Sequence, residues 1–415
     1  MLRSRRYDTI VGMTSRFRVL AIALALAFAV RLVMMAAMPV FEPSEARYAA
    51  ISANMARTGD YLSPSFTYRG EYQAFKGKPP LVFQCGGALC RLAGVSEFAV
   101  RLTPFLSFAL LLCILFQSVK SLKNASSAWL AVGICATSTA LYAASGVCMT
   151  DVSLTCCSSG ALLVYARSRQ SPRMRDAVLA GLLLGCGMLV KGPVALVLFG
   201  LPVLVDGVVN RNWRLVFSAK WLWSVAVFLA VSAPWFVLMQ REHPDFLRYF
   251  FLNENLLRFL RHDYGDRYGA GREAFHGVSV VWALVVTLPW ALFPLCDAVK
   301  RRWSAFDRRD FFLVSAVAVT AFWCMTSRVP LAYLLPVVPL FAAWLASSPS
   351  AASRLRLWRA VPAAAAIASA VTVAMLVSTL LFTDKMLGKN APKRASKRHF
   401  AYEFYHGPWG EGAPR

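Results

Sequence analysis

Residues 17–40, FRVLAIALALAFAVRLVMMAAMPV, form a run that is apolar apart from Arg18 and Arg31. Residues 41–80, FEPSEARYAAISANMARTGDYLSPSFTYRGEYQAFKGKPP, form the polar stretch that follows. An apolar run of this length can cross the hydrocarbon core of a bilayer as an α-helix. Similar runs recur along nearly the whole chain of 415 residues, which is 58% hydrophobic with a mean hydropathy of +0.51. Because lipid offers no hydrogen-bond partners, the backbone must be satisfied within helices. The sequence predicts an all-α polytopic integral membrane protein.

We predict about eleven spanning helices from the apolar runs. They lie at approximately residues 17–38, 100–118, 127–147, 152–167, 177–190, 192–209, 218–239, 276–299, 311–327, 329–347 and 359–382. Residues 80–95 are shorter, and counting them as a full span would turn every later basic loop to the other side of the membrane. We therefore interpret them as a short re-entrant or interfacial helix.

The formal net charge of +24 is distributed over short loops between the apolar segments. The basic clusters include Lys120 and Lys123, Arg167 to Arg175, Arg211 and Arg214, Lys300 to Arg302, and Arg354 to Arg359. The positive-inside rule assigns all of them to the cytoplasmic side. A nucleic-acid interface would instead gather its charge on one contiguous domain, so the expected partners are membrane lipids and not nucleic acid.

This topology places the remaining polar segments on the extracytoplasmic side. We expect one transmembrane module over residues 1–382, with residues 41–80 and 240–275 as its two large extracytoplasmic loops and residues 383–415 as a short extracytoplasmic tail. Isolated charged residues at the ends of several helices face the same side. The polar residues of interest therefore converge on one membrane face.

Two carboxylates open the first polar loop. Pro43 and Ser44 are typical of a helix start, with Ser44 as N-cap, Glu45 in the first turn and Glu42 just before it. The residues that follow carry an apolar stripe at helical spacing, which predicts an interfacial helix lying on the membrane. Unpaired backbone N–H groups there favour ionised carboxylates, and an ionised carboxylate can act as a general base. We predict catalytic roles for Glu45 and Glu42; the alternative is that Glu45 only stabilises the helix start.

Asp151 and Lys191 are isolated charges beside apolar helices. No other acidic residue occurs between Glu97 and Asp176, which makes Asp151 a second candidate for catalysis. Lys191 precedes a Gly-Pro break at the outer end of a helix, where an ammonium group can bind an anionic phosphate. The alternatives are a helix N-cap for Asp151 and a snorkelling side chain for Lys191.

Further cations lie in the two polar loops. Lys78 precedes Pro79-Pro80, a stiff turn that directs its ammonium group toward the membrane plane, although attraction to anionic headgroups would also account for it. Arg261 lies in an aromatic and basic stretch that is typical of a membrane-surface helix. The histidines have no metal-ligand spacing, so no metal site is predicted.

Several short motifs occur in an order that resembles a known family, the membrane-type polyprenyl-phosphate-sugar-dependent glycosyltransferases with a GT-C-type helical bundle. This group contains the protein O-mannosyltransferases and the lipid A aminoarabinose transferase. The matching pieces are Glu45-Ala46-Arg47-Tyr48-Ala49, Gly59-Asp60-Tyr61, Lys78-Pro79-Pro80-Leu81, Ser96-Glu97-Phe98-Ala99-Val100-Arg101, Asp151, Lys191-Gly192-Pro193, Pro234-Trp235 and Tyr333-Leu334-Leu335-Pro336.

The resemblance implies transfer of a sugar from a polyprenyl-phosphate carrier to a lipid, protein or glycan acceptor, with inversion, at the outer face of a bacterial inner membrane. It implies that carboxylates act on the acceptor and that cations hold the departing phosphate. The residues expected to contact the phosphate or headgroup are Lys78, Arg47, Tyr48, Lys191, Arg261 and Tyr333.

Two positions depart from the family pattern. Ser44 stands where the family commonly has an aspartate, so the catalytic role of that aspartate would pass to Glu45 or Glu42. Gly77 stands where the family often has a glutamate proposed as a metal ligand, so the resemblance does not carry a divalent-cation requirement to this chain. Two alternatives remain open: a catalytically inactive relative that binds or assembles, and a transporter or flippase for lipid-linked sugar.

Overall fold

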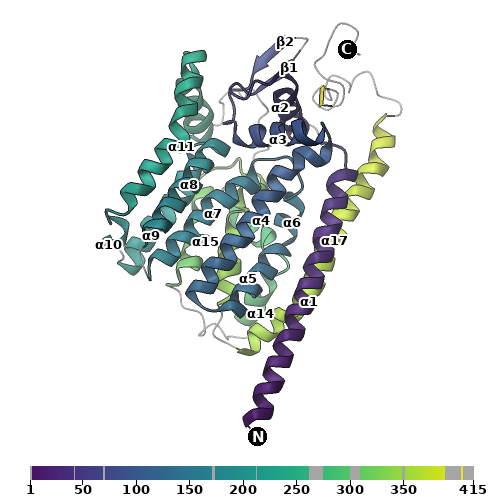
Figure 1. The fold of residues 1–415 in the computed structure, drawn as a ribbon, viewed down its shortest axis with the longest axis vertical. Helices are drawn as coiled ribbons and strands as arrows, with labels where there is room; N and C mark the ends of the chain where they lie inside the picture. Colours follow the sequence, from purple (N-terminus) through teal and green to yellow (C-terminus); the bar gives the residue numbers. More distant parts are fainter. Residues whose placement is uncertain are drawn as a thin grey trace.

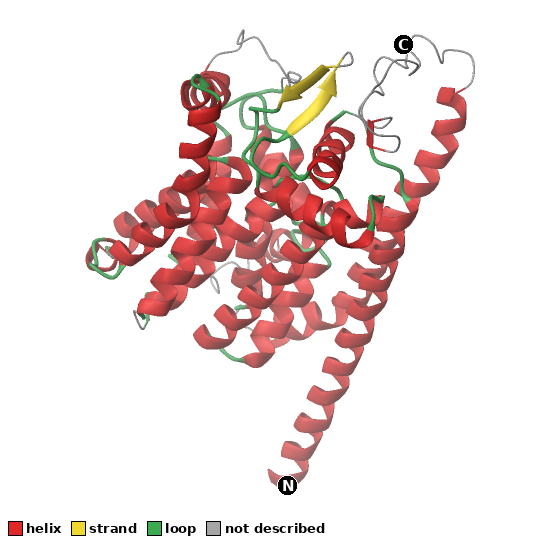
Figure 2. Ribbon diagram, turned by 45° about the horizontal axis from the view of Figure 1, so that its top comes forward, coloured by secondary structure: helices red, strands yellow, loops and turns green. Residues whose placement is uncertain are grey.

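A computed structural model describes most of the chain, and Figures 1 and 2 show it from two directions. The described residues are 2–41, 43–68, 71–170, 173–211, 213–260, 274–299, 309–347, 351–387 and 403–404. Within these ranges the chain is helical apart from one two-stranded antiparallel sheet and the connecting loops. The prediction of an all-α membrane protein is confirmed.

The elements follow one another along the chain in this order. The first half contains α1 (Leu2–Ala37), α2 (Ser44–Thr58), β1 (Ser65–Tyr68), β2 (Glu71–Ala74), α3 (Leu81–Ala93), α4 (Glu97–Leu122), α5 (Ala125–Ala136), α6 (Thr139–Ala144), α7 (Asp151–Ser168), α8 (Met174–Lys191) and α9 (Val194–Asn210). The second half contains α10 (Trp213–Val216), α11 (Trp221–Glu242), the π-helix η1 (Arg248–Leu257), α12 (Arg258–Leu260), α13 (Val278–Val286), α14 (Leu292–Val299), α15 (Phe311–Trp323), the 3-10 helix η3 (Leu331–Leu334), α16 (Val337–Ala346) and α17 (Ala351–Leu387).

Helix α7 lies at the centre of the bundle. It is buried along nearly its whole length because α4, α8, α9 and α16 all pack against it. Helices α1 and α17 run side by side along one edge of the bundle (Figure 1). Helix α11 lies at the opposite edge, where it packs against α8. Central packing fixes the position of Asp151, the first residue of α7.

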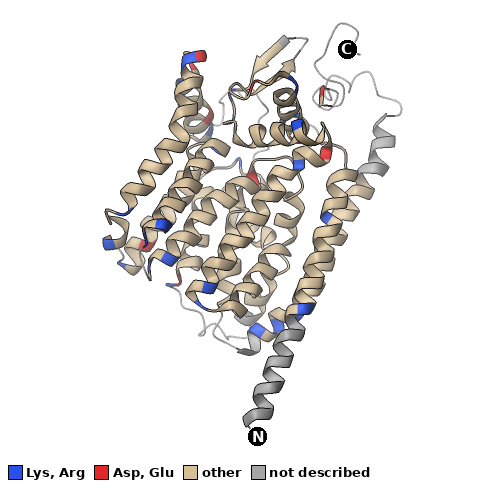
Figure 3. Cartoon of the chain, viewed as in Figure 1, with Lys and Arg blue, Asp and Glu red and all other residues tan. Residues whose placement is uncertain are grey.

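Four of the described helices are long and apolar enough to cross a membrane by themselves. They contain Phe17–Ala37, Glu97–Leu122, Trp221–Glu242 and Arg354–Ser378. Several shorter apolar helices fill the space between them. The basic ends of α4, α7, α8 and α17 gather at the end of the bundle that also holds the N-terminus (Figure 3). The opposite end, which carries α2, α3 and the β1–β2 hairpin, is called the hairpin end.

Two predicted spans are divided in the structure. The span predicted over 127–147 is broken between α5 and α6, and the span over 276–299 is broken between α13 and α14. The two breaks satisfy each other's polar groups, because Thr139 N donates to Leu288 O at 3.1 Å and Trp290 Nε1 donates to Thr137 Oγ1 at 3.1 Å. Tertiary hydrogen bonds at this contact compensate for the interrupted helices.

The hairpin end confirms one local prediction and corrects another. Residues 81–93 form the short helix α3, as expected. Ser44 is not an N-cap: α2 begins at Ser44 after Pro43, and no side chain caps its start. Helix α2 also lacks the exposed face of a surface helix, because it is buried from Glu45 to Met55 against α3, β1 and Phe404.

A buried ion pair joins this end to the bundle. Arg101 of α4 contacts Glu45 of α2, with 2.8 Å between Nε and Oε1, and both side chains are almost fully excluded from solvent. The same guanidinium donates to the carbonyl oxygens of Met35 and Pro39 at 2.9 Å and to that of Met38. Arg101 therefore caps the last carbonyls of α1 while holding the start of α2.

Close packing of α8 on α11 depends on glycine. A Cβ atom added at Gly181 would lie 2.4 Å from Ser224 O, and one at Gly185 would lie 2.8 Å from Val231 Cβ. Small residues at such positions let two helix backbones approach closely, which is a main source of association between helices in lipid.

We predict that Gly181→Ala destabilises the protein, because the new methyl group meets backbone that cannot move cheaply. Overpacking of this kind costs about 1–3 kcal/mol. The matched control is Gly200→Ala in α9, where an added Cβ meets nothing within 4 Å. Thermal unfolding in detergent measures both; equal midpoints for the two variants would show that α8 and α11 do not pack this closely.

Removal of Arg101 provides a second stability test. Arg101→Gln leaves the Glu45 carboxylate buried without its cation, and we expect a loss of about 3–5 kcal/mol. The double variant Arg101→Gln/Glu45→Gln should recover part of that loss because no unpaired charge remains. A double-mutant cycle of unfolding free energies measures the coupling, and a coupling near zero would contradict the role given to the pair.

Candidate functional site

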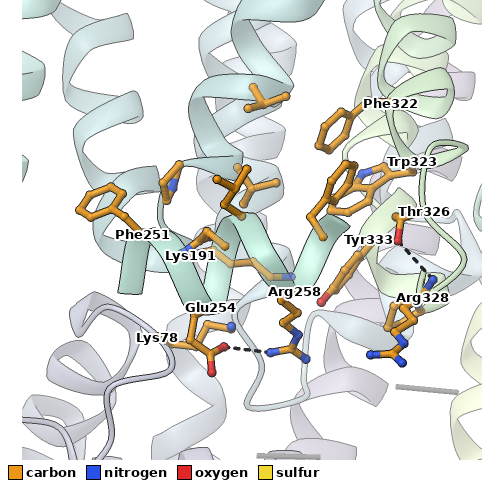
Figure 4. A pocket seen from close by; sticks show the side chains of 17 residues that line it. Lys78, Lys191, Phe251, Glu254, Arg258, Phe322, Trp323, Thr326, Arg328 and Tyr333 are labelled. Carbon is orange, nitrogen blue, oxygen red and sulfur yellow. Dashed lines mark hydrogen bonds and ion pairs between the residues drawn. The ribbon is translucent and has the colours of Figure 1, made fainter. Parts of the chain in front are cut away.

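A cavity of about 410 Å³ opens near the hairpin end of the bundle (Figure 4). Its wall combines apolar and aromatic side chains with four cationic ones and one carboxylate. The lining residues are Lys78, Lys191, Pro193, Val194, Val197, Phe251, Glu254, Asn255, Leu256, Arg258, Phe259, Phe322, Trp323, Thr326, Arg328, Pro330 and Tyr333. A cavity with apolar walls and a few convergent charges suits an amphiphilic ligand with an anionic group.

The two isolated charges predicted from the sequence meet in a buried ion pair. Asp151 begins α7 and Lys191 ends α8, and Lys191 Nζ donates to Asp151 Oδ1 at 2.5 Å. The ammonium group also lies over the ring of Tyr333, 4.1 Å from its centroid. Lys191 lines the cavity, so Asp151 holds a cation at the cavity wall.

Arg47 and Tyr48 approach the same cluster from α2. Tyr48 is buried, and its electrostatic neighbours include Arg47, Lys191, Asp151 and Tyr333. Burial raises the pKa of the Tyr48 phenol, which keeps the hydroxyl neutral and able to donate a hydrogen bond. The Arg47 guanidinium lies over the Tyr48 ring at 5.7 Å. Stacking on this ring orients the cation.

Lys78 enters the cavity from the loop between β2 and α3. Its ammonium group donates to Gly77 O at 2.9 Å. Burial lowers the pKa of Lys78 to about 8; the nearby carboxylate of Glu254 opposes this shift, while the cations of Arg258 and Lys191 add to it. A half-buried ammonium group among other cations gains most from an anionic ligand, because the anion replaces lost solvation and reduces the repulsion.

Glu254 and Arg258 are functional candidates that the sequence interpretation did not select. Glu254 is buried, accepts from Tyr249 Oη at 2.6 Å and accepts from Arg258 Nη1 at 3.1 Å. Figure 4 shows this ion pair beside Lys78. Glu254 and Arg258 are four residues apart within an aromatic stretch, a spacing that predicts an ion pair on one face of a helix.

Aromatic rings also line the cavity, and one of them contacts a cation. Trp323 and Tyr333 have ring centroids 4.6 Å apart, and Phe259 stacks on Phe322 at 5.3 Å. All four residues line the cavity. Rigid aromatic surface of this kind can bury an apolar portion of a ligand while the cations hold its charge.

Glu45 lies apart from this cavity and is not one of its lining residues. Its Oε2 accepts from Phe41 N at 2.9 Å, and its Oε1 accepts from Cys148 N at 2.9 Å in addition to the bonds from Arg101. The bond to Cys148 holds the loop that leads into Asp151. The predicted residues Glu42 and Arg261 lie outside the described residues.

The described residues do not form a metal site. Gly77 occupies the position at which the resemblance would require a glutamate ligand. Within the described ranges, no three His, Cys, Asp or Glu side chains are grouped so that they could hold a metal ion. We therefore derive no step through a metal.

Parts of the chain are similar to known proteins. Residues 77–237 match a family described as dolichyl-phosphate-mannose-protein mannosyltransferase. The undecaprenyl phosphate-alpha-4-amino-4-deoxy-L-arabinose arabinosyl transferase of Pectobacterium atrosepticum is 28% identical over 321 residues, which cover 74% of this chain and 55% of the relative. The Shewanella sediminis protein of the same name is 30% identical over 274 residues, covering 63% of this chain and 46% of that protein. The chain thus spans about half the length of these relatives.

Solved structures support the fold. ArnT from Cupriavidus metallidurans, bound to undecaprenyl phosphate, superposes with a TM-score of 0.69 at 21% identity over 93% of this chain and 75% of that chain. An oligosaccharyltransferase from Archaeoglobus fulgidus superposes with a TM-score of 0.52 at 13% identity over 96% of this chain and 61% of that chain. The chain is therefore similar in sequence and in fold to the GT-C-type membrane glycosyltransferases, the group that includes the protein mannosyltransferases and the aminoarabinose transferases.

Proposed function

We propose that this protein transfers a sugar from a polyprenyl-phosphate carrier to an acceptor at the outer face of a bacterial inner membrane. The observation that carries the proposal is the cavity in which Lys78, Lys191 and Arg258 meet a wall of aromatic and aliphatic side chains. A polyprenyl phosphate joins one anionic group to a long hydrocarbon chain. The cavity offers a complementary surface to both parts.

The proposed reaction is a single inverting displacement. An acceptor oxygen attacks the anomeric carbon of the sugar, and the bond from that carbon to the carrier phosphate oxygen breaks. The electron pair of that bond remains on the phosphate, which leaves with one more negative charge. Lys78 and Lys191 stabilise this developing charge, which is larger in the transition state than in the bound donor.

The carboxylates have separate proposed roles. Asp151 holds Lys191 at the cavity wall and accepts the proton when the acceptor is a hydroxyl group. Glu45 positions the loop before Asp151 through its bond to Cys148 N, and this geometry favours a positioning role over direct catalysis. The predictions that Glu45 and Glu42 act as catalytic groups stay untested predictions.

The named relatives suggest a narrower substrate. Their names specify an undecaprenyl-phosphate carrier and a 4-amino-4-deoxy-arabinose. We propose the same carrier and a sugar of this kind, with a lipid acceptor such as lipid A, which the family resemblance implies. Mass spectrometry of envelope lipids from cells with and without this gene tests the proposal, because only transfer adds the mass of the sugar.

Carrier binding should depend on pH through Lys78. Below its pKa of about 8 the Lys78 ammonium group is charged, and a bound phosphate raises that pKa further. The affinity for the carrier is therefore highest below pH 8 and falls as the pH rises above 8. We predict that Lys78→Gln weakens binding of undecaprenyl phosphate by about tenfold, or about 1.4 kcal/mol.

Lys78→Arg is the matched control, because arginine stays charged over this range. Its affinity should be constant between pH 7.5 and 9.5, measured by native mass spectrometry of the purified protein. A parental protein whose affinity is also constant over this range would contradict the role of Lys78.

The Asp151–Lys191 pair is tested by removing both charges together. Asp151→Asn/Lys191→Gln leaves no unpaired buried charge, so we expect the double variant to fold but to lose sugar transfer by about 100-fold. The control Arg167→Gln/Asp176→Asn removes the ion pair that joins the other ends of α7 and α8, and it should retain transfer. Equal transfer rates for the two double variants would assign the Asp151 pair a purely structural role.

A further inference from the structure

Two residues of the tail, Glu403 and Phe404, are buried against the hairpin end. Glu403 Oε1 accepts from Asn54 Nδ2 at 2.6 Å and from Thr67 N at 2.7 Å. Asn54 lies in α2 and Thr67 in β1, so one carboxyl oxygen joins a helix to the hairpin. The Phe404 ring lies in the apolar cluster that contains Tyr48. We call Glu403 and Phe404 together the tail clamp.

The carboxyl group of Glu403 is buried without an ion-pair partner in the described part of the chain. Arg57 of α2 donates to the main-chain oxygens of Glu403 and Phe404, at 3.1 and 2.7 Å. These hydrogen bonds hold the backbone of the tail clamp and not the carboxyl group. An ionised carboxylate in this place loses its solvation without a paired charge, which is costly.

Three buried oxygens at this contact have no hydrogen-bond partner: Glu403 Oε2, Asn54 Oδ1 and Thr67 Oγ1. A carboxylate oxygen and an amide oxygen are both acceptors, so Oε2 and Oδ1 cannot satisfy each other while Glu403 is ionised. The single hydroxyl proton of Thr67 cannot serve both. A protonated carboxyl group is itself a donor, and Glu403 already shares one hydrogen bond with the Asn54 amide. A proton on Oε2 therefore allows a second hydrogen bond between the same two groups.

The charged and titratable groups around Glu403 are Arg57 in α2 and Tyr72 in β2. Burial raises the pKa of Glu403 above its ordinary value of 4.5, while hydrogen bonds from Asn54 and Thr67 and the charge of Arg57 oppose the rise. Because the pKa of the docked residue is the higher one, docking is strongest below the ordinary value. It weakens as the pH rises through the docked value.

We propose that Glu403 is a positioning residue that docks as the neutral acid, paired with the Asn54 amide, and so holds the tail clamp on α2 and β1. Helix α2 also carries Arg47 and Tyr48, and Tyr48 has Lys191 and Asp151 among its electrostatic neighbours. The tail clamp therefore fixes the helix that presents these two side chains to the ion pair at the cavity wall. The predicted topology places the tail outside the cytoplasm, where a fall in pH tightens the clamp.

Hydrogen–deuterium exchange of the full-length protein measures docking, because Thr67 N donates to Glu403 Oε1 and exchanges when the tail clamp leaves. The β1 peptide is followed by mass spectrometry at pH 5 and pH 8.5, with correction for the intrinsic pH dependence of exchange. We expect protection at pH 5 to exceed that at pH 8.5 by about threefold or more. Equal protection at the two pH values would overturn the proposal.

The variant Glu403→Gln separates the neutral acid from the ionised carboxylate. Its amide keeps an acceptor for Asn54 Nδ2 and Thr67 N and adds a donor that does not ionise, so protection should be high and equal at both pH values. Glu403→Ala should lose protection at both. Asp245→Asn, which removes an exposed carboxylate just after α11, is the matched control and should retain the parental pH dependence.

One comparison decides between the two protonation states. At pH 8.5 the Glu403→Gln variant should be better protected than the parental protein. If it is instead as poorly protected as Glu403→Ala, the ionised form is the one that docks and the proposal is wrong. Should Glu403→Ala fail to fold, the comparison of Glu403→Gln with the parental protein still gives the answer.

Binding of undecaprenyl phosphate, measured by native mass spectrometry, links the tail clamp to the cavity and rests on the proposed function. Affinity should fall several-fold in Glu403→Ala and stay unchanged in Glu403→Gln. If exchange follows the expected pattern but all variants bind the carrier equally, the neutral pair stands and the positioning role fails. If the parental protein binds no carrier, the proposed function fails, and the exchange experiment still tests the docking of Glu403.

Discussion

The buried ion pair of Glu45 and Arg101 is the contact on which the arrangement of the hairpin end depends. One guanidinium caps the final carbonyls of α1, and one carboxylate holds the start of α2 and the backbone that leads into α7. Because neither charge reaches water, each must keep its partners, and the geometry of four chain segments is fixed together.

This constraint bears directly on the chemistry. The loop held by Glu45 delivers Asp151 to the end of α7, where Asp151 binds Lys191 at the wall of the cavity. Two buried ion pairs thus contribute to the geometry of the cavity wall. The Glu45–Arg101 pair positions the loop before α7, and the Asp151–Lys191 pair positions the Lys191 ammonium group. In the proposed reaction, such preorganisation lets the cations act on the leaving phosphate without rearranging as charge develops.

The sequence predicted the parts of the fold that local pattern controls. Long apolar runs identified the helices, and the predicted topology placed Asp151 and Lys191 on the same membrane face. The ion pair between them was not predicted. The breaks at Thr137 and Leu288 were missed because the groups that compensate for them come from the opposite break, far away in the chain. The motif that contains Arg101 was noted, but its partner in another helix was not evident from spacing.

The burial of α2 was missed for a related reason. Its apolar residues suggested a helix with one buried stripe, whereas long-range contacts cover it on all sides, including Phe404 and Glu403 from the tail. Glu403 accepts from Asn54 Nδ2 at 2.6 Å and from Thr67 N at 2.7 Å, a contact across more than three hundred residues that no local pattern encodes.

The central claim is that cations from distant parts of the chain hold one carrier phosphate in the cavity. A cryo-electron microscopy map of the protein in nanodiscs with undecaprenyl phosphate tests it most directly. The account predicts phosphate density within hydrogen-bond reach of Lys78 Nζ and Lys191 Nζ, with the prenyl chain along Trp323 and Phe322. Phosphate density outside the cavity, with Lys78 and Lys191 making no contact to it, would contradict the account.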